Sequence, residues 1–175
     1  MKIGVMSDSH GDVRAVARAF EMFQAFGCET VFHLGDGVRD VGSVSQQYAM
    51  EVISVHGNMD YAPGTPIEHI YTADGLRFFL SHGHSLEVHR TRYYLRNRAR
   101  ETGCQVALYG HTHAAHNQEE DGILMLNPGS VSRPKGSARA SLAVIDTNGG
   151  KPLAKIYWLW EENQDPGEAM PKAGK

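Results

Sequence analysis

The first 56 residues alternate between short apolar segments and helical patterns, and this alternation strongly limits the possible folds. The apolar segments, which predict strands, are residues 2–7, 30–34 and 51–56. A helix is predicted over residues 12–25, begun by Asp12 and closed by Gly27, and a second over residues 38–48. The order β-α-β-α-β implies parallel strands joined by helical crossovers. We therefore expect an α/β fold.

The rest of the chain predicts shorter strands in a different order. Residues 67–80 indicate a hairpin, and residues 88–101 indicate a basic, amphipathic helix. Further strands are expected near residues 105–109, 115–119, 123–126, 140–146 and 152–158. We predict one domain over residues 1–160 and a flexible polar tail over residues 161–175.

The composition is that of an ordinary soluble protein. Among its 175 residues 41% are hydrophobic and 21% charged, and the net charge of −3 gives no footprint for nucleic acid or anionic membrane. No apolar run approaches the ~20 residues of a membrane helix. Cys28 and Cys104 each follow a predicted helix, so we expect buried free thiols in a reducing compartment. Because a strand already begins at Lys2, we expect no signal peptide and a cytoplasmic location.

Five predicted strands end in short loops whose side chains could bind a metal. The loops contribute Asp8 and His10; Asp36; Asn58 and Asp60; His82 and His84; and His111 and His113. Sites in open α/β sheets form beyond the carboxyl ends of strands, so these loops should meet at one edge. A single loop of this kind is usually a cap, a turn or a surface pair. Five of them together predict a metal centre.

The loop motifs also occur together in a known family. They are Asp8-Ser9-His10, Gly35-Asp36, Gly57-Asn58, His82 and Gly110-His111-Thr112-His113. Together they resemble the five motifs of the calcineurin-like metallophosphoesterases. The short length, the segment Gly57-Asn58-Met59-Asp60 and the later Asn127-Pro128-Gly129-Ser130 are similar to its small bacterial and archaeal phosphodiesterase branch, the YfcE type. The resemblance implies a four-layer α-β-β-α sandwich, with two mixed β-sheets flanked by helices.

The resemblance further implies a centre of two divalent metal ions. The implied ligands of the first are Asp8, His10, Asp36 and His113; Asp36 bridges to the second, which Asn58, His82 and His111 complete. Nitrogen and oxygen ligands suit Mn, Fe, Zn, Co or Ni, and we expect Mn. Two such ions roughly 3.5–4 Å apart can share a hydroxide that attacks phosphorus in line. Two divalent ions, two carboxylates and one hydroxide sum to a single positive charge, which complements a phosphodiester anion.

Four further residues receive expected roles beside the ligands. Met59 replaces a histidine that is thought to act as an acid in the larger branch of the family, and a thioether cannot transfer a proton. We therefore expect a bias toward phosphodiesters with stabilised leaving groups. Asp60 should either orient a ligand or water or cap the following turn. His84 is expected near the ligands without binding metal directly, and Arg133 is a candidate contact to substrate phosphate.

Several alternatives remain at this point. The site could serve a phosphomonoesterase or a small nuclease, and a scaffold subunit of the eukaryotic retromer resembles the same fold. All seven ligand positions carry competent side chains, which favours an enzyme acting on a small phosphodiester. The arginines of residues 88–101 favour a solvated face, so nucleic acid is expected only as a small nucleotide substrate, and no membrane partner is expected. His33 is predicted to be a core histidine with a backbone partner, and the oligomeric state is not predicted.

Overall fold

The computed structural model describes residues 1–135 and 139–160, so the predicted tail lies outside the described residues. The chain forms two mixed five-stranded sheets in the orders β10-β9-β1-β2-β3 and β4-β5-β6-β8-β7. The first sheet contains β1 (Lys2–Met6), β2 (Thr30–His33), β3 (Glu51–Ser54), β9 (Ser141–Asp146) and β10 (Leu153–Trp158). The second contains β4 (Glu68–Ala73), β5 (Leu76–Ser81), β6 (Val106–Leu108), β7 (His116–Glu120) and β8 (Ile123–Asn127).

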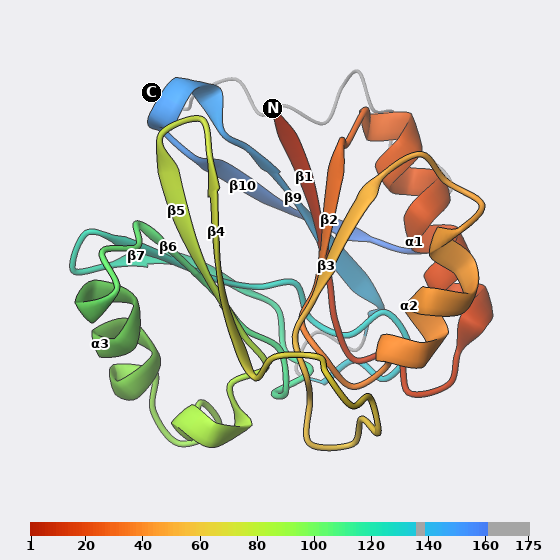
Figure 1. The fold of residues 1–175 in the computed structure, drawn as a ribbon, viewed down its shortest axis with the longest axis horizontal. Helices are drawn as coiled ribbons and strands as arrows, with labels where there is room; N and C mark the ends of the chain where they lie inside the picture. The colour runs from red at the N-terminus through yellow and green to blue at the C-terminus, as the bar shows by residue number, and fades with distance from the viewer. Residues whose placement is uncertain (136–138, 161–175) are drawn as a thin grey trace.

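Helices cover the outer faces of both sheets. Figure 1 shows α1 (Val13–Phe26) and α2 (Val38–Ser45) on one side of the molecule and α3 (Tyr93–Glu101) on the other. Two short 3-10 turns, His84–Leu86 and Asn148–Gly150, complete the regular structure of the described residues. The predicted four-layer sandwich is therefore confirmed. Within the described residues, no helix has both the length and the apolar character needed to cross a membrane.

The first half of the chain forms the expected parallel unit. β1, β2 and β3 are parallel neighbours, with Val5 opposite Phe32 and Phe32 opposite Ile53. Asp12 begins α1 by accepting a hydrogen bond from the Ala15 backbone N–H at 3.0 Å, as predicted. Gly27 ends the helix with a φ of 73°, a left-handed conformation that glycine adopts without steric cost.

Alternation along the strands divides the core into three layers. Ile3 and Val5 point into the apolar layer between the two sheets, whereas Met6 faces α1. Gly4 also faces α1, and a Cβ built there would lie 2.5 Å from the ring of Phe23. Because glycine has no Cβ at this position, α1 can approach the sheet closely.

The structure differs from the sequence-based expectation at α3. The helix begins at Tyr93 and not at residue 88. Glu87 has a left-handed φ of 51°, and the backbone N–H of Val88 bonds back to Gly83. Glu87 thus ends the 3-10 turn of residues 84–86, and residues 88–92 form a turn and a short loop, so the amphipathic pattern starts five residues before the helix does.

The predictions for the two cysteines and for His33 differ in outcome. Cys28 and Cys104 are buried free thiols, which confirms that prediction. His33 is fully buried, but neither of its ring nitrogens has a hydrogen-bond partner among the described residues, so the expected backbone partner is wrong. Burial lowers the pKa of His33 to about 4, because the charged imidazolium would lose its hydration.

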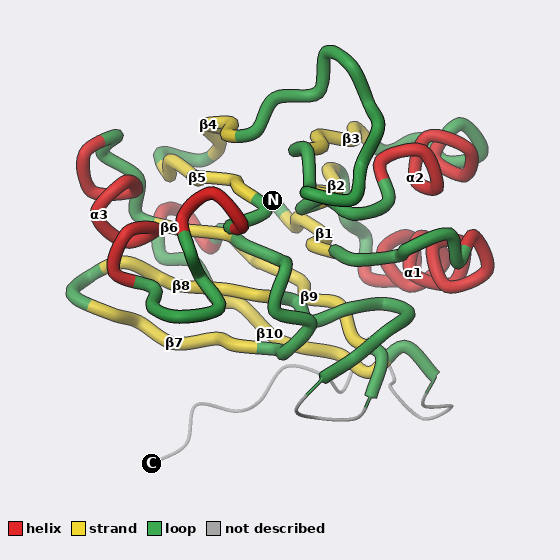
Figure 2. Tube along the Cα trace, turned by 90° about the horizontal axis from the view of Figure 1, so that it is seen from below, coloured by secondary structure: helices red, strands yellow, loops and turns green. Residues whose placement is uncertain are grey.

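The loops that follow β1, β2, β3, β5 and β6 gather at one edge of the sandwich. This edge is at the bottom of Figure 1, and Figure 2 looks onto it from below. β8 runs parallel to β6, so the segment after it reaches the same edge. All the loops that carry predicted ligands therefore lie at the same edge of the sandwich.

Candidate metal centre

The backbone at this edge is held in an uncommon conformation. Nine non-glycine residues among those described have positive φ. Five of the nine are predicted ligands: Asp8 (58°), His10 (45°), Asp36 (57°), His111 (65°) and His113 (57°). Such conformations are costly and cluster at functional sites, where the surrounding structure holds them in place. The strain therefore marks the predicted loops as a site.

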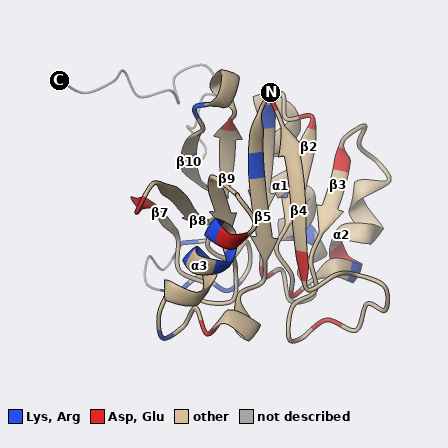
Figure 3. Ribbon diagram, turned by 60° about the vertical axis from the view of Figure 1, so that its left-hand side comes forward, with Lys and Arg blue, Asp and Glu red and all other residues tan. Residues whose placement is uncertain are grey.

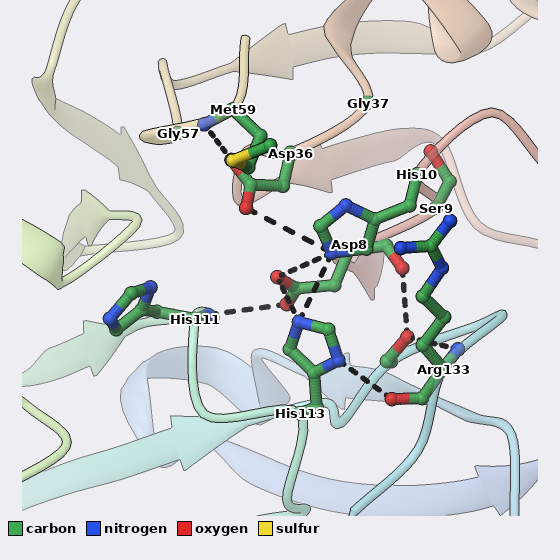
Figure 4. A network of polar contacts seen from close by, with 12 residues as sticks. Asp8, Ser9, His10, Asp36, Gly37, Gly57, Met59, His111, His113 and Arg133 are labelled. Carbon is green, nitrogen blue, oxygen red and sulfur yellow. Dashed lines mark hydrogen bonds and ion pairs between the residues drawn. The ribbon is translucent and has the colours of Figure 1, made fainter.

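Asp8, His10 and His113 converge on one point. Their ligand atoms all lie within 4.8 Å of one another. Asp8 Oδ1 is 3.3 Å from His113 Nε2 and 3.8 Å from His10 Nε2, and the two imidazole nitrogens are 3.1 Å apart (Figure 4). Asp8 Oδ1 is buried and has no hydrogen-bond partner among the described residues. A buried carboxylate oxygen without a donor is costly, and a cation would satisfy it.

Neighbouring groups orient this first cluster. His113 Nδ1 lies 2.6 Å from the carbonyl oxygen of Arg133, so with its proton on Nδ1 the imidazole presents Nε2 to the site. The hydroxyls of Ser130 and Ser132 donate to the carbonyl of Asp8 at 2.8 and 3.0 Å. The carboxylate of Asp8 raises the pKa of His113, while burial lowers the pKa of His10. The supporting serines carry no sequence signal of their own, although the resemblance had pointed to their loop.

Asp8, Asp36 and His82 form a second, overlapping cluster. His82 Nδ1 lies 2.7 Å from the carbonyl oxygen of Leu34, which leaves Nε2 facing Asp36 Oδ2 at 3.4 Å and Asn58 Oδ1 at 3.1 Å. Asp36 Oδ2 is also 3.9 Å from His10 Nε2 and thus lies between the two clusters. A carboxylate in this position is the one that could bridge two cations.

The charges of the second cluster stabilise one another. Burial alone would raise the pKa of Asp36, but His82, the backbone N–H of Met59 and His10 outweigh burial and lower it to about 2. Burial alone would lower the pKa of His82, but the hydrogen bond and charge of Asp36, with the charge of Asp8, raise it. Asp36 is therefore ionised and ready to bind a cation.

His111 and His84 lie beside these clusters without joining either one. The ring centroid of His111 is 5.1 Å from that of His82 and 6.2 Å from that of His84, and its backbone N–H donates to Asp8 Oδ2 at 3.2 Å. His84 Nδ1 is buried and has no hydrogen-bond partner among the described residues. Burial lowers the pKa of both imidazoles, and the charge of His82 lowers it further.

Asp60 holds the loop that carries Asp36. Its carboxylate accepts hydrogen bonds from the backbone N–H groups of Asp36 (2.8 Å), Gly37 (2.9 Å), Val38 (2.9 Å) and Gly57 (2.9 Å). Burial would raise its pKa, but these four donors outweigh burial and lower it. Asp60 thus holds the loop of a predicted ligand, the start of α2 and the turn that precedes it, and none of its four donors belongs to the following turn that it was expected to cap.

Gly57 is required for a steric reason. Its φ is not positive, so a left-handed backbone is not what requires glycine here. A Cβ built at Gly57 would lie 2.1 Å from Asp36 Oδ1 and 2.4 Å from the Asp36 backbone nitrogen. The absence of a side chain therefore lets the two loops touch.

A cleft of about 350 Å³ lies beside His10 and Asp36. Its lining includes His10, Asp36, Met59 and Arg133, so the predicted substrate contact does face the site. The lining also includes Arg39 and Tyr61, for which the sequence offered no signal. The cleft is open to solvent at Met59, which is 70% exposed.

The arginines of the α3 region are paired with carboxylates. Arg90, Arg92, Arg96, Arg98 and Arg100 each lie 2.6–3.7 Å from the nearest carboxylate oxygen. Blue and red segments accordingly adjoin at α3 in Figure 3. Their positive charge is therefore neutralised locally.

Comparison with known proteins identifies relatives over most of the chain. Residues 1–150 match the calcineurin-like phosphoesterase superfamily domain. The phosphodiesterase YfcE of Escherichia coli is 31% identical over 170 residues, which cover 85% of this chain and 89% of that protein. A predicted phosphoesterase from Streptococcus pneumoniae has a similar structure, with a TM-score of 0.76 at 28% identity over 90% of this chain and 89% of that one. Vps29 of Entamoeba histolytica, crystallised with Zn²⁺, shares the fold at 22% identity, with a TM-score of 0.77 and coverage of 93% and 94%.

Proposed function

The chain belongs to the calcineurin-like phosphoesterase superfamily, and from this premise we propose that it is a two-metal phosphodiesterase. One observation carries the proposal. The buried Asp8 Oδ1 has no hydrogen-bond donor among the described residues, while two imidazole nitrogens point at it from 3.3 and 3.8 Å. Relatives named as phosphodiesterases support the choice of diester chemistry.

The side chains present fit two divalent cations. The proposed ligands of the first are Asp8, His10, Asp36 and His113, and those of the second are Asp36, Asn58, His82 and His111. Nitrogen and oxygen donors of this kind suit Mn, which we propose, as well as Fe, Zn, Ni or Co. When bound, such cations supply positive charge and activated water for in-line displacement at phosphorus.

The protein itself positions the reacting groups. The carbonyls of Leu34 and Arg133 hold the Nδ1 atoms of His82 and His113. The Nε2 atom of His82 therefore faces Asp36, and that of His113 faces Asp8. The side chain of Arg133 lines the same cleft, where its guanidinium can bind a phosphoryl oxygen. Met59 has no proton to donate, so the leaving group takes its proton from solvent, or from another group such as His10 where a metal does not fully occupy it. Esters of acidic alcohols or phenols should therefore be the better substrates.

The proposal is tested with matched chromogenic substrates. We expect the Mn-loaded protein to hydrolyse bis(p-nitrophenyl) phosphate faster than p-nitrophenyl phosphate, in a comparison across Mn, Fe, Zn, Ni and Co. Asp36→Asn should reduce the rate at least ~100-fold, more than the loss of an outer partner typically costs. Asp121→Asn, an exposed surface change, is the control.

Two results would redirect the assignment. Faster hydrolysis of the monoester would indicate a phosphomonoesterase with the same site. If neither ester were hydrolysed with any metal, and Asp36→Asn had no effect on metal binding, a non-catalytic scaffold would be the better reading.

A further inference from the structure

Two large apolar side chains are exposed at the mouth of the cleft. Met59 is 70% exposed and Tyr61 is 75% exposed, and both line the cleft that contains His10 and Asp36. Water contact with this much apolar surface is unfavourable, and exposed apolar groups beside a polar site are typical of ligand-binding surfaces. The mouth of the cleft therefore offers an apolar contact next to the proposed phosphoryl site.

Arg39 fixes the position of the Tyr61 ring. Its guanidinium carbon lies 5.4 Å from the ring centroid, within the range of a cation–π contact. Arg39 belongs to the first turn of α2, and Tyr61 directly follows Asp60, whose carboxylate binds the start of that helix. The pair is thus built on the same loops that hold Asp36.

The cleft is lined by charges of both signs: the arginines Arg39 and Arg133, and the aspartates Asp36, Asp40 and Asp60. Among residues 1–135 and 139–160, no carboxylate forms an ion pair with Arg39 or Arg133. Both arginines line the cleft, in contrast to the paired arginines of the α3 region. An anion that enters the cleft meets a guanidinium on its way to the proposed cations.

Resting on the proposed function, we infer that Tyr61 and Arg39 form a stacking platform for a planar ring, such as a nucleobase, carried by the phosphodiester. With its phosphoryl group beside His10 and Asp36, a nucleoside ester would extend toward the exposed ring of Tyr61. The flexible thioether of Met59 would adapt to the edge of the bound ring. The substrate class is therefore aromatic or nucleoside phosphodiesters, in preference to simple alkyl esters.

Two substrates with the same leaving group test this inference. The p-nitrophenyl ester of thymidine 5′-phosphate and methyl p-nitrophenyl phosphate differ only in the group that stays on phosphorus. Stacking of one base typically gives ~10-fold or more, so wild-type kcat/KM should be at least ~10-fold higher for the nucleoside ester. Tyr61→Ala should reduce the ratio of the two kcat/KM values toward one, whereas Tyr61→Phe, which keeps an aromatic ring, should retain the wild-type ratio.

Tyr93 offers a matched control. It is 53% exposed on α3 and carries Arg96 at 5.8 Å from its ring centroid, but it does not line the cleft. Tyr93→Ala should keep the wild-type ratio. An equal kcat/KM of wild type for the two esters, or an equal ratio in Tyr61→Ala and wild type, would overturn the inference.

A binding measurement separates this inference from the proposed function. The probes are the phosphonate isosteres of AMP and of ribose 5-phosphate, which cannot be hydrolysed and differ only in the base. Calorimetry on the Mn-loaded protein should give a Kd ~10-fold lower for the AMP isostere, and Tyr61→Ala should remove the difference. Equal affinities would refute the platform even if diesters are hydrolysed. A Tyr61-dependent preference without any hydrolysis would support the platform and refute the phosphodiesterase.

Discussion

Replacing Asp60 by asparagine tests how the ligand loop is held. In the wild type each carboxylate oxygen accepts two backbone N–H groups: Oδ2 those of Asp36 and Gly57, and Oδ1 those of Gly37 and Val38. The asparagine side chain has one oxygen and one NH₂ group. It can therefore satisfy only two of the four donors and turns its own N–H groups toward the other two.

The size of the effect follows from those two lost acceptors. A buried donor left without a partner costs ~1–3 kcal/mol, and these donors are partly buried, so Asp60→Asn should lower the free energy of unfolding by about 3 kcal/mol. Loss of the negative charge at the start of α2 adds several tenths of a kcal/mol. This is a large share of the ~5–15 kcal/mol that stabilises a typical domain.

The assay is urea unfolding of metal-free protein, since bound metal would add its own stabilisation. Asp121→Asn, which weakens two surface ion pairs of an exposed carboxylate, should remain within ~1 kcal/mol of wild type. The folded-state pKa of Asp60 is lowered, so its contribution is present above the unfolded pKa of ~3.9 and is lost as the pH falls through the folded value. The difference between Asp60→Asn and wild type should therefore be full at pH 7 and shrink below pH ~4. If Asp60→Asn and Asp121→Asn were equally stable at pH 7, the role assigned to Asp60 would be wrong.

Three further substitutions test other parts of the account. Gly57→Ala places a Cβ 2.1 Å from Asp36 Oδ1 and should weaken Mn binding at least ~10-fold by calorimetry, and unchanged affinity would refute the steric role. In wild type the free energy of unfolding should fall by roughly 1.4 kcal/mol per pH unit as the pH falls from 6.5 toward about 4, because the His33 imidazole takes up a proton in the unfolded chain before it does so in the folded one. His33→Phe should remove this loss, and parallel stability–pH curves for the two proteins would contradict it. Met59→His should make the rate depend less steeply on leaving-group pKa across a series of aryl and alkyl diesters, and equal slopes in both proteins would exclude a missing proton donor.

The placement of the site could be predicted because the β-α-β-α-β order in the sequence indicates parallel strands. Parallel strands end at the same edge, so loops as far apart as those of Asp8 and His113 were expected to meet, and their side chains do meet at 3.3 Å. The left-handed backbone of these residues was not predictable from residue type, because aspartate also adopts it in ordinary hairpin turns, such as those at Asp74 and Asp121.

Contacts between residues that are distant in the sequence could not be predicted. The donors that Asp60 binds lie up to 24 residues before it in the chain, and no local pattern records such a pairing. Tyr61 and Arg39 look like ordinary surface residues until the fold brings them to one cleft. The start of α3 was placed too early for a related reason. The amphipathic pattern begins at residue 88, but residues 88–92 form a turn and a short loop, in which the backbone N–H groups of Arg90 and Thr91 bond to the carbonyl of Glu87.

The central claim is that these loops bind two divalent cations that share the carboxylate of Asp36. Its most direct test is the metal content of purified protein, measured by mass spectrometry after loading with Mn²⁺ and dialysis. We predict two equivalents per chain for wild type and for Asp121→Asn, and fewer than one for Asp36→Asn, because Asp36 is the proposed ligand of both cations. Retention of two equivalents by Asp36→Asn, or one equivalent or fewer in wild type, would contradict the account.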